Sequence, residues 1–153
     1  MAHLSSTYQS LCAQARALLA GQNHRIANAA NLSALVFQEM PDLNWAGFYF
    51  VEGNELIVGP FQGKPACVRI PMGRGVCGTA AVRGQTQRVA DVHAFDGHIA
   101  CDAASRSEIV VPLYLGDALL GVLDIDSPVA GRFSADDQAG IEALAKIYTD
   151  SLG

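Results

Sequence analysis

The sequence predicts an α+β fold in which helices flank a six-stranded, mainly antiparallel sheet. Apolar residues recur at three- and four-residue steps near both ends of the chain, which is the spacing of amphipathic helices. Short apolar and aromatic runs separated by turn residues fill the middle, as expected for strands joined by hairpins. The 153 residues, half of them hydrophobic, are enough to bury one substantial core. We therefore expect a single domain over residues 1–153.

Two helices are expected before the first strand. Residues 4–19 carry an apolar stripe, and Ser6 is placed to begin a capping box. Asn23 is expected to cap a second helix, which Pro41 prevents from continuing. Cys12 lies on the apolar stripe of the first helix, so we expect it to be a buried, unreactive thiol.

The first two strands are expected at residues 45–51 and 56–59, where they form a hairpin. Because strand side chains alternate between faces, Trp45, Gly47 and Tyr49 share one face. A glycine between two aromatic rings predicts a hollow on that face. The two rings are then either ordinary core residues or the walls of a pocket.

The middle of the chain is expected to hold a strand at residues 67–70, a short helix at 76–82 and a strand at 88–92. The glycines at 73–75 are not followed by the lysine and hydroxyl residue of a phosphate-binding loop, which excludes that reading. A long connection at 93–107 comes next. A loop of this length in a compact domain is usually functional or disordered, and its apolar residues favour an ordered lid or pocket wall.

The last two strands are expected at residues 108–115 and 119–125, ahead of a final helix capped by Ser134. Acidic residues stand at the ends of these otherwise apolar strands: Glu108, Asp124 and Asp126. Alternation places Glu108 on a face with Val110, and Asp124 and Asp126 on a face with Leu120 and Val122, so three acids stand on adjacent strands. They are either solvated strand ends or a convergent acidic pocket.

Charge and composition exclude several classes of partner. The formal net charge of −5 offers no basic patch to neutralise phosphates, so we expect neither nucleic acid nor a membrane as a partner. No signal-peptide pattern or membrane-spanning apolar run is present, so we expect a cytoplasmic protein. Disulfides are not the default there, so the four cysteines are either core or redox-active residues: Cys12, Cys67, Cys77 and Cys101. We expect no metal and no cofactor.

The segment at residues 97–102 holds the strongest candidate for chemistry. Cys101 stands there in a polar, glycine-flanked loop, where access and neighbouring donors control how much reactive thiolate a cysteine carries. His98, three residues earlier, either lowers the pKa of that thiol or makes a structural hydrogen bond. The same two readings apply to His93.

Six runs between Asn44 and Pro128 closely resemble the free methionine (R)-sulfoxide reductases, a family with the GAF fold. The runs are NWAGFY at 44–49, GPFQGKPAC at 59–67, GRGVCG at 73–78, DVHAF at 91–95, GHIACD at 97–102 and GVLDIDSP at 121–128. The spacing of three cysteines is far more specific than the fold. The chain departs from the family at Met72 and Ala90, where an aromatic and an acidic residue are expected, and neither is a candidate site residue.

The resemblance implies a role for each candidate residue. Cys101 is the nucleophile, Cys67 is its resolving partner in a disulfide, and Cys77 is a third thiol that assists or substitutes. Trp45 and Tyr49 are pocket walls around the methionine side chain. The acids that hold the substrate are Glu108, Asp124 and Asp126. A thioredoxin-type reductant and a homodimer formed through the helices are the expected partners.

Sulfoxide reduction needs a soft nucleophile at sulfur and a proton for the departing oxygen. We expect Cys101 to attack the sulfur and Glu108 to polarise or protonate the oxygen, directly or through water. Clustered acids in an apolar pocket keep one carboxyl neutral, while the ionised ones pair with the ammonium group of free methionine sulfoxide. A methionine sulfoxide residue within a protein lacks that charge and is excluded.

Two readings from other classes stay open. The chain is alternatively a non-enzymatic GAF module that binds a small molecule. It is alternatively a thiol redox sensor in which Cys67 and Cys101 pair on oxidation and alter a partner surface. Turnover of free methionine sulfoxide separates the enzyme from both.

Overall fold

One antiparallel sheet organises the molecule in residues 4–98 and 101–153, which the computed structural model describes. Its strand order is β3-β2-β1-β6-β5-β4, and each neighbouring pair is antiparallel. The strands are β1 Trp45–Glu52, β2 Glu55–Gly63, β3 Arg69–Pro71, β4 Gln87–Val89, β5 Ser107–Leu115 and β6 Ala118–Ser127. The prediction of a six-stranded, mainly antiparallel sheet is confirmed.

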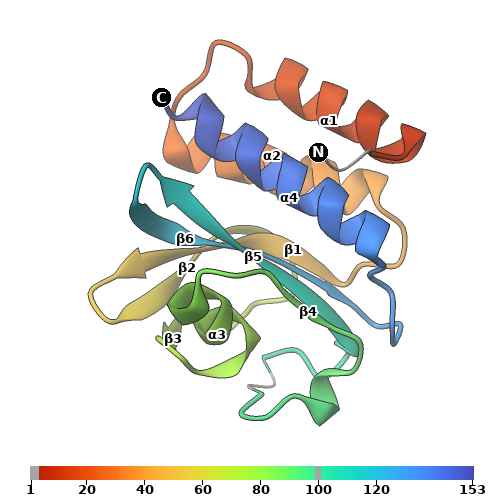
Figure 1. Cartoon of the computed structure of the whole chain (residues 1–153), viewed down its shortest axis with the longest axis vertical. Coiled ribbons are helices and arrows are strands. Elements are labelled where there is room, and N and C mark those ends of the chain that lie inside the picture. Colours follow the sequence, from red (N-terminus) through yellow and green to blue (C-terminus); the bar gives the residue numbers. More distant parts are fainter. Residues whose placement is uncertain (1–3, 99–100) are drawn as a thin grey trace.

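Helices cover both faces of this sheet, unequally (Figure 1). Two helices pack on one face, α2 Arg25–Glu39 and α4 Ala135–Ser151, and α1 Ser6–Leu19 packs mainly on these two helices, on the side away from the sheet. The short helix α3 Gly75–Arg83 lies on the opposite face, beside the connection that leads through a 3-10 turn at Val92–Ala94 to β5. Among the helices of the described residues, none has both the length and the hydropathy needed to cross a membrane.

The helix starts differ from prediction by one residue at two of three positions. Ser5, not Ser6, caps α1, because Ser5 has the extended backbone of a cap and its hydroxyl accepts from the first turn. His24, not Asn23, caps α2, where its Nδ1 accepts from two backbone N–H groups. Ser134 caps α4 as predicted, in a complete capping box.

Most strand bounds also differ from the predicted ones, by one to four residues. β2 extends to Gly63, because β1 pairs with it along its whole length down to Trp45. β3 begins at Arg69, which leaves Cys67 in the preceding loop. β4 ends at Val89, where its pairing with β5 stops.

The alternation predicted for β1 is confirmed by two separate cores. Phe48 belongs to the larger core under the three terminal helices, where its ring packs against Tyr148. Trp45 and Tyr49 belong to a smaller core on the α3 face. The hollow expected on the face of Trp45 and Tyr49 does not lie at Gly47, because Phe61 of β2 fills that space: a Cβ on Gly47 would lie 2.3 Å from the Cβ of Phe61.

Candidate active site

A pocket opens on the α3 face of the sheet, between the strands, the start of α3 and the connection before β5. It has a volume of about 40 Å³. Every predicted site residue except Cys67 lines it. The lining residues are Trp45, Tyr49, Pro65, Ala66, Ile70, Arg74, Gly75, Val76, Cys77, His98, Cys101, Asp102, Ser105, Glu108, Asp124 and Asp126. The described part of the connection before β5 therefore contributes to a pocket wall, as its length indicated, whereas its apolar residues Ile99 and Ala100 lie outside the described residues.

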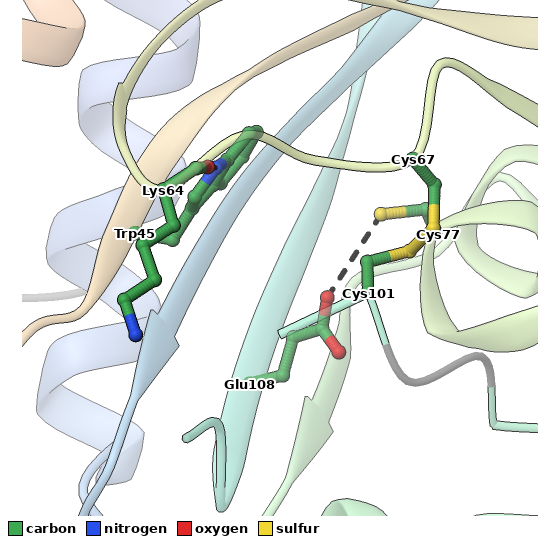
Figure 2. The surroundings of a disulfide bond; sticks show 6 residues. All are labelled: Trp45, Lys64, Cys67, Cys77, Cys101 and Glu108. Carbon is green, nitrogen blue, oxygen red and sulfur yellow. Dashed lines mark hydrogen bonds between the residues drawn. A yellow bond between two sulfur atoms is a disulfide. The ribbon is translucent and has the colours of Figure 1, made fainter. Parts of the chain in front are cut away.

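Cys101 is joined to Cys67 by a disulfide at the rim of this pocket (Figure 2). Their Cα atoms lie 5.5 Å apart although 34 residues separate them in sequence, a distance within the normal range for a disulfide. Cys67 comes from the loop between β2 and β3, outside the pocket lining. Cys12 and Cys77 are buried free thiols.

Three acidic side chains converge at the pocket floor. In the register of β5 and β6, Glu108 lies opposite Asp126, and Asp124 lies opposite the next inward-facing residue of β5. Glu108 and Asp124 are buried, and among the described residues the Oδ1 atoms of Asp124 and Asp126 have no hydrogen-bond partner. The Sγ of Cys77 lies 3.9 Å from Oε2 of Glu108 (Figure 2). The acids thus form a convergent pocket and are not solvated strand ends.

Burial decides the ionisation of this cluster. Loss of hydration and then the charge of Asp124 raise the pKa of Glu108 well above its ordinary value. Loss of hydration also raises the pKa of Asp124, of Asp126 and of the Cys77 thiol, with mutual repulsion as the next cause. The raised pKa values therefore favour the protonated carboxyls, and a cation beside them would favour carboxylates.

The aromatic wall is stacked and anchored. The ring of Trp45 stacks on Tyr49 at 5.6 Å and on Phe61 at 5.1 Å between centroids. Its Nε1 donates to the backbone oxygen of Lys64 at 3.2 Å, which ties the wall to the loop carrying Cys67 (Figure 2). Burial, followed by the charge of nearby acids, raises the pKa of Tyr49, so this wall is neutral.

The surroundings of His98 show whether it can lower the pKa of the Cys101 thiol. His98 lines the pocket, and burial together with the nearby His93 lowers its pKa. The two rings meet edge to face at 6.4 Å. A neutral imidazole supplies no positive charge to Cys101, which leaves Arg74 as the cationic side chain on the described pocket wall.

Several residues at the site were not candidates in the sequence, although Asn44 and Asp102 lie within the runs that resemble the family. Asp102 and Ser105 line the pocket beside Cys101, and both accept hydrogen bonds from Asn44. Asn44 lies 58 and 61 residues away from them in sequence. No local pattern marks such a pairing, because it depends on where the loop meets the sheet.

A cation could be held at the pocket floor. One ligand atom from each of three buried residues, Cys77, Glu108 and Asp124, lies within 4.8 Å of the others. Sulfur and carboxylate oxygen suit a divalent metal, but carboxylates in a closed pocket suit an ammonium group equally well. The donor set alone does not choose between these two kinds of cation.

The chain is similar in sequence to known proteins over most of its length. The model of the GAF domain matches residues 3–148. The free methionine-R-sulfoxide reductase of Escherichia coli is 58% identical over 137 residues, which cover 90% of this chain and 83% of that protein. The enzyme of the same name from Saccharomyces cerevisiae is 46% identical over 139 residues, covering 86% of this chain and 77% of that protein.

Solved structures agree over nearly the whole chain. The fRMsr of Staphylococcus aureus in complex with its substrate superposes with a TM-score of 0.93 at 50% identity and covers all of both chains. The free methionine-R-sulfoxide reductase of Neisseria meningitidis, also in complex with its substrate, has a TM-score of 0.92 at 40% identity. That match covers 99% of this chain and 95% of the other.

Proposed function

Because this chain belongs to the GAF-domain family and, within it, to the free methionine-R-sulfoxide reductases, we propose that its pocket reduces free methionine (R)-sulfoxide to methionine. One observation supports this reaction above all others. The disulfide that includes Cys101 stands on the same small pocket as the buried acids. A redox thiol and a proton source are the two groups that sulfoxide reduction requires.

The first step joins Cys101 to the substrate. The thiolate of Cys101 attacks the sulfoxide sulfur, and the carboxyl of Glu108 gives its proton to the oxygen, which is otherwise a poor leaving group. The bond between the two sulfurs then breaks as the hydroxyl passes from the substrate sulfur to the sulfur of Cys101, so methionine departs and Cys101 is left as a sulfenic acid. The raised pKa of Glu108 keeps that proton available at neutral pH.

The second step restores a stable oxidation state. The thiolate of Cys67 attacks the sulfenic sulfur of Cys101, water leaves, and the disulfide forms. The sum is one sulfoxide and two thiols converted to one thioether, one disulfide and one water. Burial keeps Cys77 protonated beside Glu108, which favours Cys67 over Cys77 as the resolving thiol.

The acids account for the choice of a free amino acid. The ammonium group of methionine sulfoxide enters the space at the Oδ1 atoms of Asp124 and Asp126, which no described residue pairs, and allows these acids to ionise. A sulfoxide within a polypeptide has an uncharged amide at that position and a chain that needs an exit. Trp45 and Tyr49 provide the apolar wall for the methionine side chain.

The disulfide-bonded form corresponds to the end of this cycle. Because a sulfur held in the disulfide cannot attack the sulfoxide, the substrate reacts with the reduced form, after Cys101 has separated from Cys67. A thioredoxin-type dithiol then reduces the half-buried disulfide from outside. We further propose a homodimer through the terminal helices and a reducing, cytoplasmic setting for the cycle.

The two epimers of free methionine sulfoxide test this function. With a dithiol reductant, the protein is expected to release methionine from the R epimer and not from the S epimer. Cys101→Ser should lose this activity, whereas Cys12→Ser, which alters a buried thiol of the helical core, should keep it. Turnover by Cys101→Ser would refute Cys101 as the nucleophile. No turnover by the wild type would refute the enzyme and favour the redox sensor, to which the same disulfide also points.

A further inference from the structure

Asn44 is where three parts of the site meet. It directly precedes Trp45, the aromatic wall, at the start of β1. Its backbone N–H donates to the carbonyl of Asp126 at 3.0 Å, which ties it to the acidic strand β6. Its side chain reaches the loop that carries Cys101. The reaction steps described above give Asn44 no role.

The side-chain amide of Asn44 uses both its N–H groups on that loop. Nδ2 donates to Oδ2 of Asp102 at 2.9 Å and to Oγ of Ser105 at 3.0 Å. The other carboxylate oxygen of Asp102 accepts from the backbone N–H of Ala104 at 2.9 Å. Ser105 is buried. Residues 102–105 are thus held as a closed turn against the start of β1, a central strand of the sheet.

The orientation of the Asn44 amide follows from its partners. Its Oδ1 is buried and has no hydrogen-bond partner among the described residues. The reverse orientation would set that oxygen against the carboxylate of Asp102 and leave two N–H groups without acceptors. The amide is therefore held as a donor, and a buried acceptor left unpaired is an unfavourable arrangement that the two donated bonds outweigh.

We propose that Asn44 is a positioning residue that places Cys101 for its attack on sulfur and for its disulfide with Cys67. Asp102 is bonded covalently to Cys101, so a clamp on its side chain restricts where the thiol can lie. This inference rests on the proposed function for the attack, but its effect on the disulfide does not depend on any substrate.

The test replaces the side-chain amide of Asn44, which donates, by a carboxylate of the same shape, which can only accept. Asn44→Asp sets a carboxylate against Asp102, so it loses two donated bonds and adds repulsion. The Cys67–Cys101 disulfide is then titrated with glutathione. Loss of a hydrogen bond to a charged group should lower its equilibrium constant of formation by about tenfold to a hundredfold. The rate constant of methionine release in a single turnover should fall by a similar factor, whereas the KM measured in the steady state should not change.

Two further variants separate positioning from general stability. Asn28 is a buried asparagine of α2 that donates to the backbone oxygen of Gln22 and to Ser151, on the helical face. Asn28→Asp is therefore a matched control, which should lose stability and leave the disulfide equilibrium unchanged. The double variant Asn44→Asp with Asp102→Asn exchanges donor and acceptor, and it should recover most of both losses.

Two results would overturn the role of Asn44 as a positioning residue. An equilibrium constant for Asn44→Asp within about twofold of the Asn28→Asp value, or no recovery in the double variant, overturns the inference. If Asn44→Asp does not fold, Asp102→Ala removes the acceptor from the loop side and must show the same fall. Wild-type protein that fails to reduce the sulfoxide refutes the proposed function, while the glutathione titration still reports on the clamp.

Discussion

Reduction of the Cys67–Cys101 disulfide should cost the protein a large, calculable part of its stability. The bond closes a segment of 34 residues. Loop-closure entropy for that length corresponds to about 3.8 kcal/mol at 25 °C, because the unfolded chain gains this freedom when the bond opens. For a chain of this size the melting temperature should fall by about 8–15 °C.

Urea unfolding and calorimetry, each with and without a dithiol, measure this difference. Cys101→Ser is the matched control, because it removes the bond, leaves Cys67 in place and should unfold identically with and without reductant. Cys12→Ser should respond to reductant like the wild type.

A change below about 1 kcal/mol on reduction would refute the reasoning, since the disulfide would not then restrain the unfolded chain as a closed loop. An equal loss in Cys101→Ser would refute it as well, because the reductant would be acting elsewhere. The prediction bears on function, because the proposed external dithiol must open a bond that stabilises the fold.

Further predictions concern recycling and the acids. Cys67→Ser should release about one methionine per active site and lose thioredoxin-supported cycling; unchanged cycling would identify Cys77 as the resolving thiol. The value of kcat should fall as pH rises through the raised pKa of Glu108, and Glu108→Gln should remove that limb of the pH–rate profile. Because the folded carboxyls hold protons that the unfolded chain releases at ordinary pKa values, the unfolding free energy in urea should decrease as pH rises above the ordinary carboxyl range, less steeply in Glu108→Gln. Asp124→Asn should mainly raise KM, by about tenfold, and Glu108→Gln should mainly lower kcat; the reverse order would exchange acid and binder.

Local patterns account for much of the fold. Strand alternation correctly separated Phe48 from Trp45 and Tyr49, because successive side chains of a strand must point to opposite faces. The turn after β5 was predictable for the same kind of reason, since its residues suit a tight hairpin. The starts of α1 and α2 were missed by one residue because neighbouring side chains can serve equally well as caps.

Long-range contacts account for what local patterns missed. The space expected above Gly47 is filled by Phe61, which comes from the paired strand and stacks on Trp45. The charge of His98 could not be assigned from its position three residues before Cys101, because it depends on burial and on His93. Both outcomes depend on groups brought together by folding.

The sequence by itself determined the order of elements, the face on which the acids lie and, through its likeness to a known family, the candidate cysteines. These follow from side-chain period, turn chemistry and motif spacing, which are properties of neighbouring residues. Only the tertiary structure decided the distance between Cys67 and Cys101, the raised pKa of Glu108 and the hydrogen bond from Asn44 to Asp102. Each of these depends on burial or contact between segments far apart in the chain, because hydration and hydrogen bonding act through space.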